Sequence, residues 1–152
     1  MNIFVLDRCP DKSAQMMCDK HVIKMILESN QMLSTIAREN GLDAPYRSTH
    51  SKHPCTIWAG KSKQNWNWLV QHSRALCQEY TKRYGKIHKS QRVTEWAEKL
   101  NISLPDTGQT EFALAMPAKY RVLCPVQSYR DYYKGDKARF ASWRTGKAPD
   151  WW

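Results

Sequence analysis

The chain has 152 residues, of which 41% are hydrophobic and seven are tryptophan, and this composition excludes a disordered protein. A chain of this length can bury a core without disulfide bonds. No apolar run reaches the roughly 18 to 20 residues of a membrane span, and the amino end lacks a signal-peptide pattern. We therefore expect a cytoplasmic protein that has no membrane partner. The net charge of +10 favours nucleic acid as a partner. The alternative is that the charge serves only to keep the protein soluble.

The cysteines and histidines do not predict a metal centre. The five cysteines form no CxxC pair, so reduced thiols are expected rather than disulfides. Cys55 lies near His50 and His53, but no second cluster completes a tetrahedral site. The phosphate-loop, dinucleotide, esterase and HExxH motifs do not occur. We expect no cofactor and no metal.

The amino-terminal part of the chain predicts one long helix. Residues 2–6 are apolar and β-type, which indicates either a strand or an extended lead-in. Asp11 or Ser13 then suits the cap of a helix that continues to about Arg38. Gly41 is typical of the residue after a helix end.

The middle and the end of the chain also read as helical. Residues 46–56 form a loop in which Pro54 suits the first turn of a helix over 57–84, with a break at Gly60. Gly85 ends that helix, and a shorter one is expected at 90–100. The last forty residues mix short helices with loops. The sequence thus predicts a mainly α fold, a single compact helical domain over residues 1–152, with a short amino-terminal strand as an option.

The long helix carries polar groups on an apolar stripe. His21, Met25, Glu28 and Met32 fall on one face, and Lys24 lies four residues before Glu28. One interpretation is a structural network in which these groups satisfy one another. The other is a site with shifted pKa values for acid–base or Schiff-base chemistry. We take Glu28, Lys24 and His21 as candidate catalytic residues.

A loop before the second helix gathers cations and imidazoles. Arg47, His50, Lys52 and His53 occur within seven residues, which suits phosphate contact or proton transfer near neutral pH. Simple exposure of loop histidines is the alternative. We assign His53 to the candidate catalytic set and the other three to DNA binding.

The carboxyl end, residues 119–152, interleaves cations with aromatic residues. Cations of this kind hold phosphates, and aromatic rings stack on exposed bases. A wrapping segment whose aromatics seal the core is the alternative. By contrast, Trp58 and Trp68 at helical spacing are expected in the core. The DNA-binding candidates in this segment are Arg130, Tyr133, Lys134, Lys137, Arg139 and Trp143.

Three stretches resemble small conserved proteins of tailed bacteriophages: "DKHVIKMILESNQMLST", "THSKHPCTIW" followed by "NWLV", and "YRDYYKGDKARFASW". More distantly, the order of features resembles the pyrimidine-dimer DNA glycosylase/AP lyase family of the endonuclease V type. The matching pieces are Glu28, His53, "EYTKRYG" at 79–85 and "YYKGDK" at 132–137. The resemblance implies a small, basic, mostly helical enzyme that acts on DNA.

The resemblance also implies an amine that forms a Schiff base with the opened sugar. The family uses the amino group exposed when the initiator methionine is removed. Here the bulk of Asn2 favours retention of Met1, so the amine would belong to Met1 or to Lys24, with Glu28 steering protons. His21 and Lys24 stand where the family's catalytic helix carries arginines.

Three functions follow as hypotheses. The first is a base-excision enzyme that binds double-stranded DNA and attacks a deoxyribose C1′. The second is a non-catalytic protein that binds DNA or a host factor, and the third is an enzyme on free nucleotides or modified bases, such as a transferase. The oligomeric state does not follow from the sequence.

Overall fold

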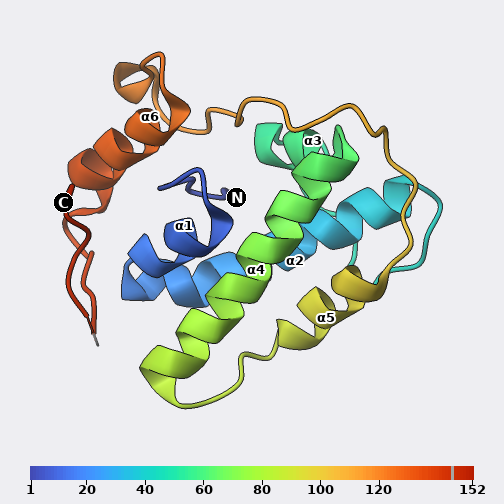
Figure 1. Cartoon of the computed structure of the whole chain (residues 1–152), viewed down its shortest axis with the longest axis horizontal. Coiled ribbons are helices and arrows are strands. Elements are labelled where there is room, and N and C mark those ends of the chain that lie inside the picture. Colours follow the sequence, from blue (N-terminus) through green and yellow to red (C-terminus); the bar gives the residue numbers. More distant parts are fainter. Residues whose placement is uncertain (145) are drawn as a thin grey trace.

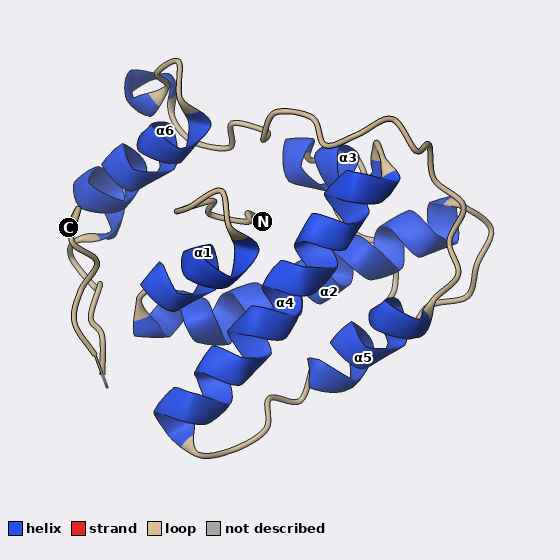
Figure 2. Cartoon of the chain, viewed as in Figure 1, coloured by secondary structure: helices blue, strands red, loops and turns tan. Residues whose placement is uncertain are grey.

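The computed structural model describes residues 1–144 and 146–152, and within them it contains helices and loops but no strand (Figure 2). The predicted mainly α fold is confirmed. The two long helices α2 and α4 pack against each other, and the shorter elements surround them (Figure 1). The helices are α1 (Pro10–Met16), α2 (Asp19–Glu39), α3 (Pro54–Gly60), α4 (Lys63–Tyr84), α5 (Gln91–Lys99), η1 (Ala118–Tyr120), α6 (Pro125–Tyr132) and η2 (Tyr133–Lys137).

The prediction of one continuous helix from residue 11 to residue 38 is wrong. Met17 and Cys18 have extended backbone, and they separate α1 from α2. A distant side chain holds this break, because the Arg83 guanidinium donates to the carbonyl of Met17 at 2.7 Å and pairs with the Asp19 carboxylate at 3.1 Å. Met17 and Asp19 lie more than sixty residues from Arg83 in the sequence, so local periodicity could not reveal the break.

The amino-terminal segment is an extended lead-in, and the strand option is wrong. Residues 3–6 are at most 4% exposed, yet no strand pairs with them among the described residues. Side chains take the place of a partner strand. The Asn2 Oδ1 accepts from the backbone N–H groups of Ile3 and Phe4, and Ser13 Oγ accepts from that of Leu6. Ser13 is therefore a buried anchor for this segment and not a helix cap.

The structure of α3 and α4 agrees closely with the helix boundaries predicted from the sequence. Pro54 occupies the first turn of α3, the chain breaks after Gly60, and Gly85 ends α4 in the left-handed conformation with φ +67°. A side chain at Gly60 would meet Ile36 at 3.3 Å, so glycine permits the close approach of α3 to α2. The prediction that Trp58 and Trp68 belong to the core is confirmed, since they are 4% and 5% exposed.

The carboxyl-terminal segment covers one end of the helical core. After α6 and η2, the chain passes the carboxyl end of α1 (Figure 1), where Trp143 Nε1 donates to the carbonyl of Met16 at 3.0 Å. Tyr129 and Tyr133 are completely buried. Several aromatic residues of this segment therefore complete the core. No described helix is long and apolar enough to cross a membrane.

A buried histidine makes the fold sensitive to acid. His72 on α4 is fully buried, stacks on Trp68 and bonds the carbonyl of Pro10 through Nδ1 at 3.0 Å. Burial lowers its pKa from 6.5 to about 4. Between these two values the unfolded chain binds a proton that the folded chain does not, so stability falls as the pH falls through this window.

We expect His72 to contribute a slope of about 1.4 kcal/mol per pH unit to the free energy of unfolding over that window. Chemical denaturation of wild type and His72→Phe at several pH values between 4 and 6.5 measures it. Phenylalanine preserves the stacking on Trp68 but cannot take up a proton. Equal slopes in the two proteins would contradict the assignment.

Candidate active site

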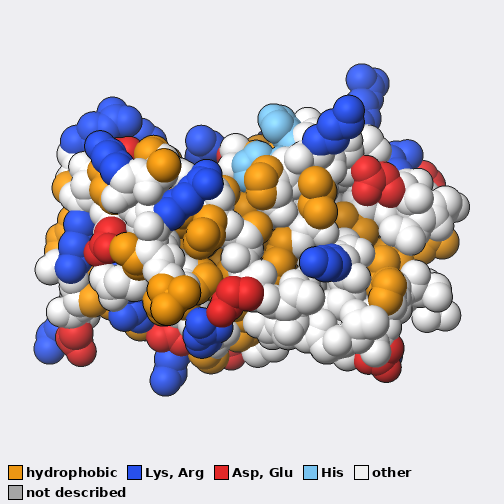
Figure 3. Space-filling view, turned by 90° about the horizontal axis from the view of Figure 1, so that it is seen from above, with side chains coloured by type: hydrophobic (Ala, Val, Ile, Leu, Met, Phe, Trp, Pro, Cys, Tyr) orange, Lys and Arg blue, Asp and Glu red, His pale blue; other side chains and the backbone are white. Residues whose placement is uncertain are grey.

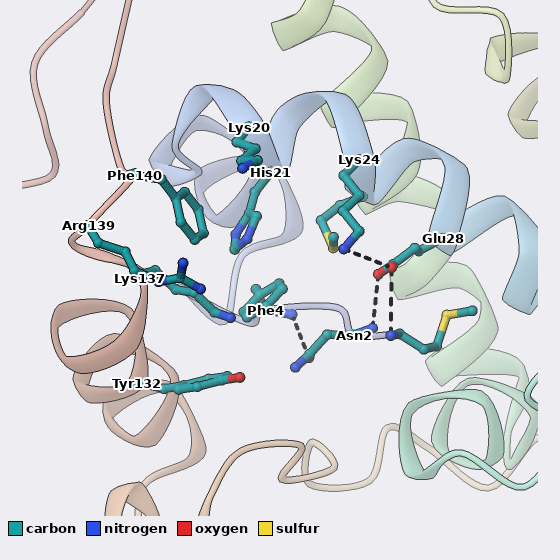
Figure 4. Close-up of a pocket in the computed structure, with 12 residues that line it drawn as sticks. Asn2, Phe4, Lys20, His21, Lys24, Glu28, Tyr132, Lys137, Arg139 and Phe140 are labelled. Atoms are coloured by element: carbon teal, nitrogen blue, oxygen red, sulfur yellow. Dashed lines mark hydrogen bonds and ion pairs between the residues drawn. The ribbon is translucent and has the colours of Figure 1, made fainter.

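The amino terminus and Glu28 meet at the floor of a pocket. The Met1 amino group lies 3.6 Å from Glu28 Oε1, and the backbone N–H of Asn2 donates to Glu28 Oε2 at 3.1 Å (Figure 4). Lys24 Nζ approaches the same Oε1 at 3.8 Å. One carboxylate therefore holds two successive nitrogens of the chain's first residues and the ammonium group of Lys24.

Glu28 is buried at the pocket because it lies on the apolar face of α2. His21, Met25, Glu28 and Met32 are all at most 8% exposed, which matches their common helical face. A carboxylate on such a face needs partners because burying an unpaired charge is costly. The amino terminus supplies that partner, together with Lys24.

The first two residues are fixed in position. The Met1 side chain is 2% exposed, although the residue as a whole is half-buried, so its solvent contact is through backbone atoms. Asn2 is 7% exposed, and its Nδ2 donates to the carbonyl of Ala115 at 2.7 Å. These anchors hold the amino group at the pocket with little freedom.

His21 forms the wall of the pocket next to Phe4. Its Nδ1 shares a 2.6 Å hydrogen bond with the buried hydroxyl of Tyr133, and its ring stacks on Phe4 with centroids 4.2 Å apart. Burial, together with the positive charges of Lys137, Lys24 and Lys20, lowers the pKa of His21 from 6.5 to about 3. His21 is thus a neutral imidazole at physiological pH.

Phe4 has a backbone conformation that is rare for a bulky residue. Its φ of +56° lies in the left-handed region, and residues in such conformations cluster at functional sites. The conformation places the ring against His21 and, at 5.9 Å between centroids, Tyr132. The aromatic wall of the pocket thus depends on a strained residue of the lead-in segment.

Cations surround the mouth of the pocket, whose volume is about 320 Å³. Lys137 lies 4.8 Å from the ring centroid of Tyr132, and Lys20 lies 4.7 Å from that of Phe140. Among the described residues that line the pocket, Glu28 is the only acid, so the pocket suits an anionic ligand with a flat apolar part. The lining residues are Met1, Asn2, Phe4, Lys20, His21, Lys24, Met25, Glu28, Tyr132, Lys137, Arg139 and Phe140 (Figure 4).

His53 lies outside the lining but within electrostatic reach of the amine. It caps α3, where its Nδ1 accepts from the backbone N–H of Cys55 at 3.1 Å. Burial lowers the pKa of His53, and the charge of the amino terminus lowers it further, while Glu28 raises it. Because Nδ1 is an acceptor, the neutral ring carries its proton on Nε2.

Comparison with known proteins identifies the family. The profile of the pyrimidine dimer DNA glycosylase family matches residues 1–93. The chain belongs to this family. No curated protein and no solved structure matches it. The resemblance to this family is confirmed over Glu28, His53 and residues 79–85, whereas the motif at 132–137 lies beyond the match. Membership indicates a DNA glycosylase-type function on pyrimidine dimers.

The matched part of this glycosylase-family chain contains most of the pocket. Residues 1–93 include Met1, Glu28 and His53, whereas Tyr132 and Lys137 come from the segment beyond the match. Among the described residues, no three His, Cys, Asp or Glu side chains lie together as metal ligands.

The predicted catalytic residues largely come together in this glycosylase-family pocket. Glu28, Lys24 and His21 line it, whereas His53 lies outside the lining but within electrostatic reach of the amine. Their catalytic roles remain predictions. Met1 is one of the two amines that the sequence predicts as candidates. Tyr132 and Phe140 belong to the aromatic-rich segment 119–152, whereas nothing in the sequence indicates Phe4. Lys20, one helical turn before Lys24, can be found from spacing.

The predicted DNA-binding residues divide into exposed and structural groups. Tyr133 is wrong as a DNA contact, because it is completely buried and its hydroxyl bonds His21. Arg130 bonds the carbonyl of Leu6 at 2.9 Å, and Trp143 packs on α1, so both have structural contacts. The exposed or half-buried cations and histidine that stay as predictions are Arg47, His50, Lys52, Lys134, Lys137 and Arg139.

Gly135 permits the close packing of Tyr120 against η2, the element that carries Lys137 of this pocket. A Cβ at this position would overlap the Tyr120 hydroxyl, which donates to Asp136 at 2.7 Å. We expect Gly135→Ala to destabilise the protein by about 1–3 kcal/mol through overpacking. Thermal unfolding beside Gly146→Ala, where an added methyl group meets nothing within 4 Å, measures the effect. Equal melting temperatures in the two variants would contradict it.

Proposed function

We propose that the protein is a DNA glycosylase with AP lyase activity that acts on pyrimidine dimers in double-stranded DNA, and that the Met1 α-amino group is its nucleophile. The observation that carries this proposal is the placement of that amino group 3.6 Å from the buried Glu28 carboxylate, at a pocket rimmed by cations. Family membership supports the DNA substrate.

Met1 is a better candidate nucleophile than Lys24. The Lys24 side chain is 63% exposed, whereas Met1 is anchored by a side chain that is 2% exposed. A fixed amine reacts with less loss of conformational freedom than a mobile one.

The proposed reaction begins at C1′ of the damaged nucleotide. Attack by the neutral amine forms an N–C1′ bond and breaks the glycosidic bond, whose electron pair leaves with the base. Loss of the amine proton, rupture of C1′–O4′ and protonation of O4′ then give the iminium. Removal of a C2′ proton expels the 3′ phosphate by breaking C3′–O, and water hydrolyses the remaining iminium to free the amine.

The roles of the side chains follow from their positions. Glu28 can accept the proton from the attacking amine and hand it to O4′. His21 is neutral, so it can form hydrogen bonds at the pocket wall without adding a charge. The rim cations Lys137 and Arg139 suit the phosphates on either side of the sugar. On the face shown in Figure 3, histidines lie between two groups of lysine and arginine side chains along the upper edge, which supports a path for the DNA backbone.

Borohydride trapping tests the proposed function. A duplex oligonucleotide with one cyclobutane pyrimidine dimer is incubated with the protein and sodium borohydride, which reduces the iminium to a stable amine. We expect a covalent complex and strand cleavage with the damaged duplex and neither with the undamaged control. Tight binding of the damaged duplex without adduct or cleavage would instead favour the non-catalytic hypothesis.

A further inference from the structure

The solvent-facing strip of α2 has an unusual composition. Between residues 20 and 37, all of which the structure describes, the exposed side chains are two lysines and two aliphatic residues, Lys20, Ile23, Lys24 and Leu27. Ile23 is 42% and Leu27 is 40% exposed. A strip of this kind that faced only water would be polar throughout. Its aliphatic residues therefore require another explanation.

The strip is continuous with the rim of the pocket. Lys20 and Lys24 both line the pocket, and helical spacing places Leu27 beside Lys24 and Ile23. Leu27 also directly precedes Glu28 in the chain. A ligand large enough to extend beyond the pocket along α2 would consequently touch these aliphatic side chains.

A neighbouring loop extends the same pattern. His88 Nε2 donates to the carbonyl of Ile23 at 3.0 Å, which ties residues 85–90 to this end of the strip. In that loop Ile87 is 70% exposed and lies between the exposed Lys86 and Lys89. Exposed aliphatic residues flanked by lysines thus occur on two elements that lie side by side.

We propose that Ile23 and Leu27 form a wedge that enters the base stack of duplex DNA beside the lesion. This proposal rests on the proposed function, and it assigns Ile23 and Leu27 the role of positioning the DNA for that reaction. Apolar side chains inserted between base steps unstack and kink DNA, at a cost that damaged steps lower. The flanking lysines complement the phosphates on either side, and the exposed strip carries no acid that would repel them. A protein partner that docked through this strip would have to be acidic at its edges, and that is the alternative outcome.

The test compares Ile23→Ala/Leu27→Ala with wild type on two substrates. The first is a duplex containing a pyrimidine dimer, and the second is a single-stranded oligonucleotide with a ready-made abasic site, which needs no unstacking. We expect the single-turnover rate on the duplex to fall at least about ten-fold, and borohydride trapping on the single strand to stay within about two-fold. Leu27→Met in the wild-type background should retain duplex activity. Ile57→Ala, which removes a 56% exposed side chain on α3, is the matched control.

A fluorescent probe separates the wedge from the chemistry. 2-Aminopurine beside the dimer brightens when it is unstacked, and binding of Glu28→Gln protein should produce this signal without cleavage. Adding the Ile23→Ala/Leu27→Ala changes should abolish the signal. The wedge is excluded if the signal persists, if both substrates lose activity equally, or if the changes abolish only association with an acidic protein. Failure of wild type to trap the single strand would overturn the proposed function, while the fluorescence would still test the wedge.

Discussion

A protein that carries two extra residues, Gly-Ser, ahead of Met1 is expected to lose Schiff-base formation, with a drop in strand cleavage on the order of 100-fold or more. The extension converts the amine 3.6 Å from Glu28 into a non-nucleophilic amide. Cleavage of an amino-terminal affinity tag leaves such an extension, and gel assays of strand cleavage measure the loss.

The same two residues added after Trp152 serve as the matched control, and that protein should cleave at the wild-type rate. DNA affinity of the extended protein should change little, because the rim cations remain. Wild-type cleavage by the protein extended at the amino end would show that the amine of Met1 is not the nucleophile and would direct attention to Lys24.

Replacement of Glu28 by glutamine is expected to lower the single-turnover cleavage rate by about 10²- to 10⁴-fold. Glutamine can still accept the hydrogen bond from the Asn2 N–H, but it cannot take up a proton or pair with Met1 and Lys24. Rapid-quench kinetics on dimer-containing duplex measures the rate, and a binding isotherm measures affinity separately.

Glu39→Gln, at the exposed end of the same helix, is the control and should behave as wild type. If Glu28→Gln cleaved normally, the carboxylate would have only a structural role. If neither wild type nor variant cleaved while both bound damaged DNA, the non-catalytic hypothesis would replace the present proposal.

Local sequence signals predicted the helical framework well because the interactions behind them are local. Pro54 at a helix start and Gly85 at a helix end act through their own backbone preferences, so they could be placed without knowledge of the fold. The burial of Glu28 followed in the same way from the spacing of the apolar residues around it.

Features that depend on distant partners could not be predicted. The break before α2 depends on Arg83, and the buried path of the lead-in depends on Asn2 and Ser13. The composition around Tyr133 predicts a DNA contact, although its hydroxyl bonds His21 in the core. Composition indicates what a segment can contact, but only the fold decides which of its side chains face outward.

In the proposed function Met1 performs the chemistry, and the identity of the trapped residue is the most direct test of this role. After borohydride reduction with dimer-containing duplex, nuclease and protease digestion followed by mass spectrometry locates the sugar remnant. We expect it on the α-amino group of the peptide that begins at Met1. A remnant on Lys24, or no remnant on any peptide while the DNA is still cleaved, would contradict the account.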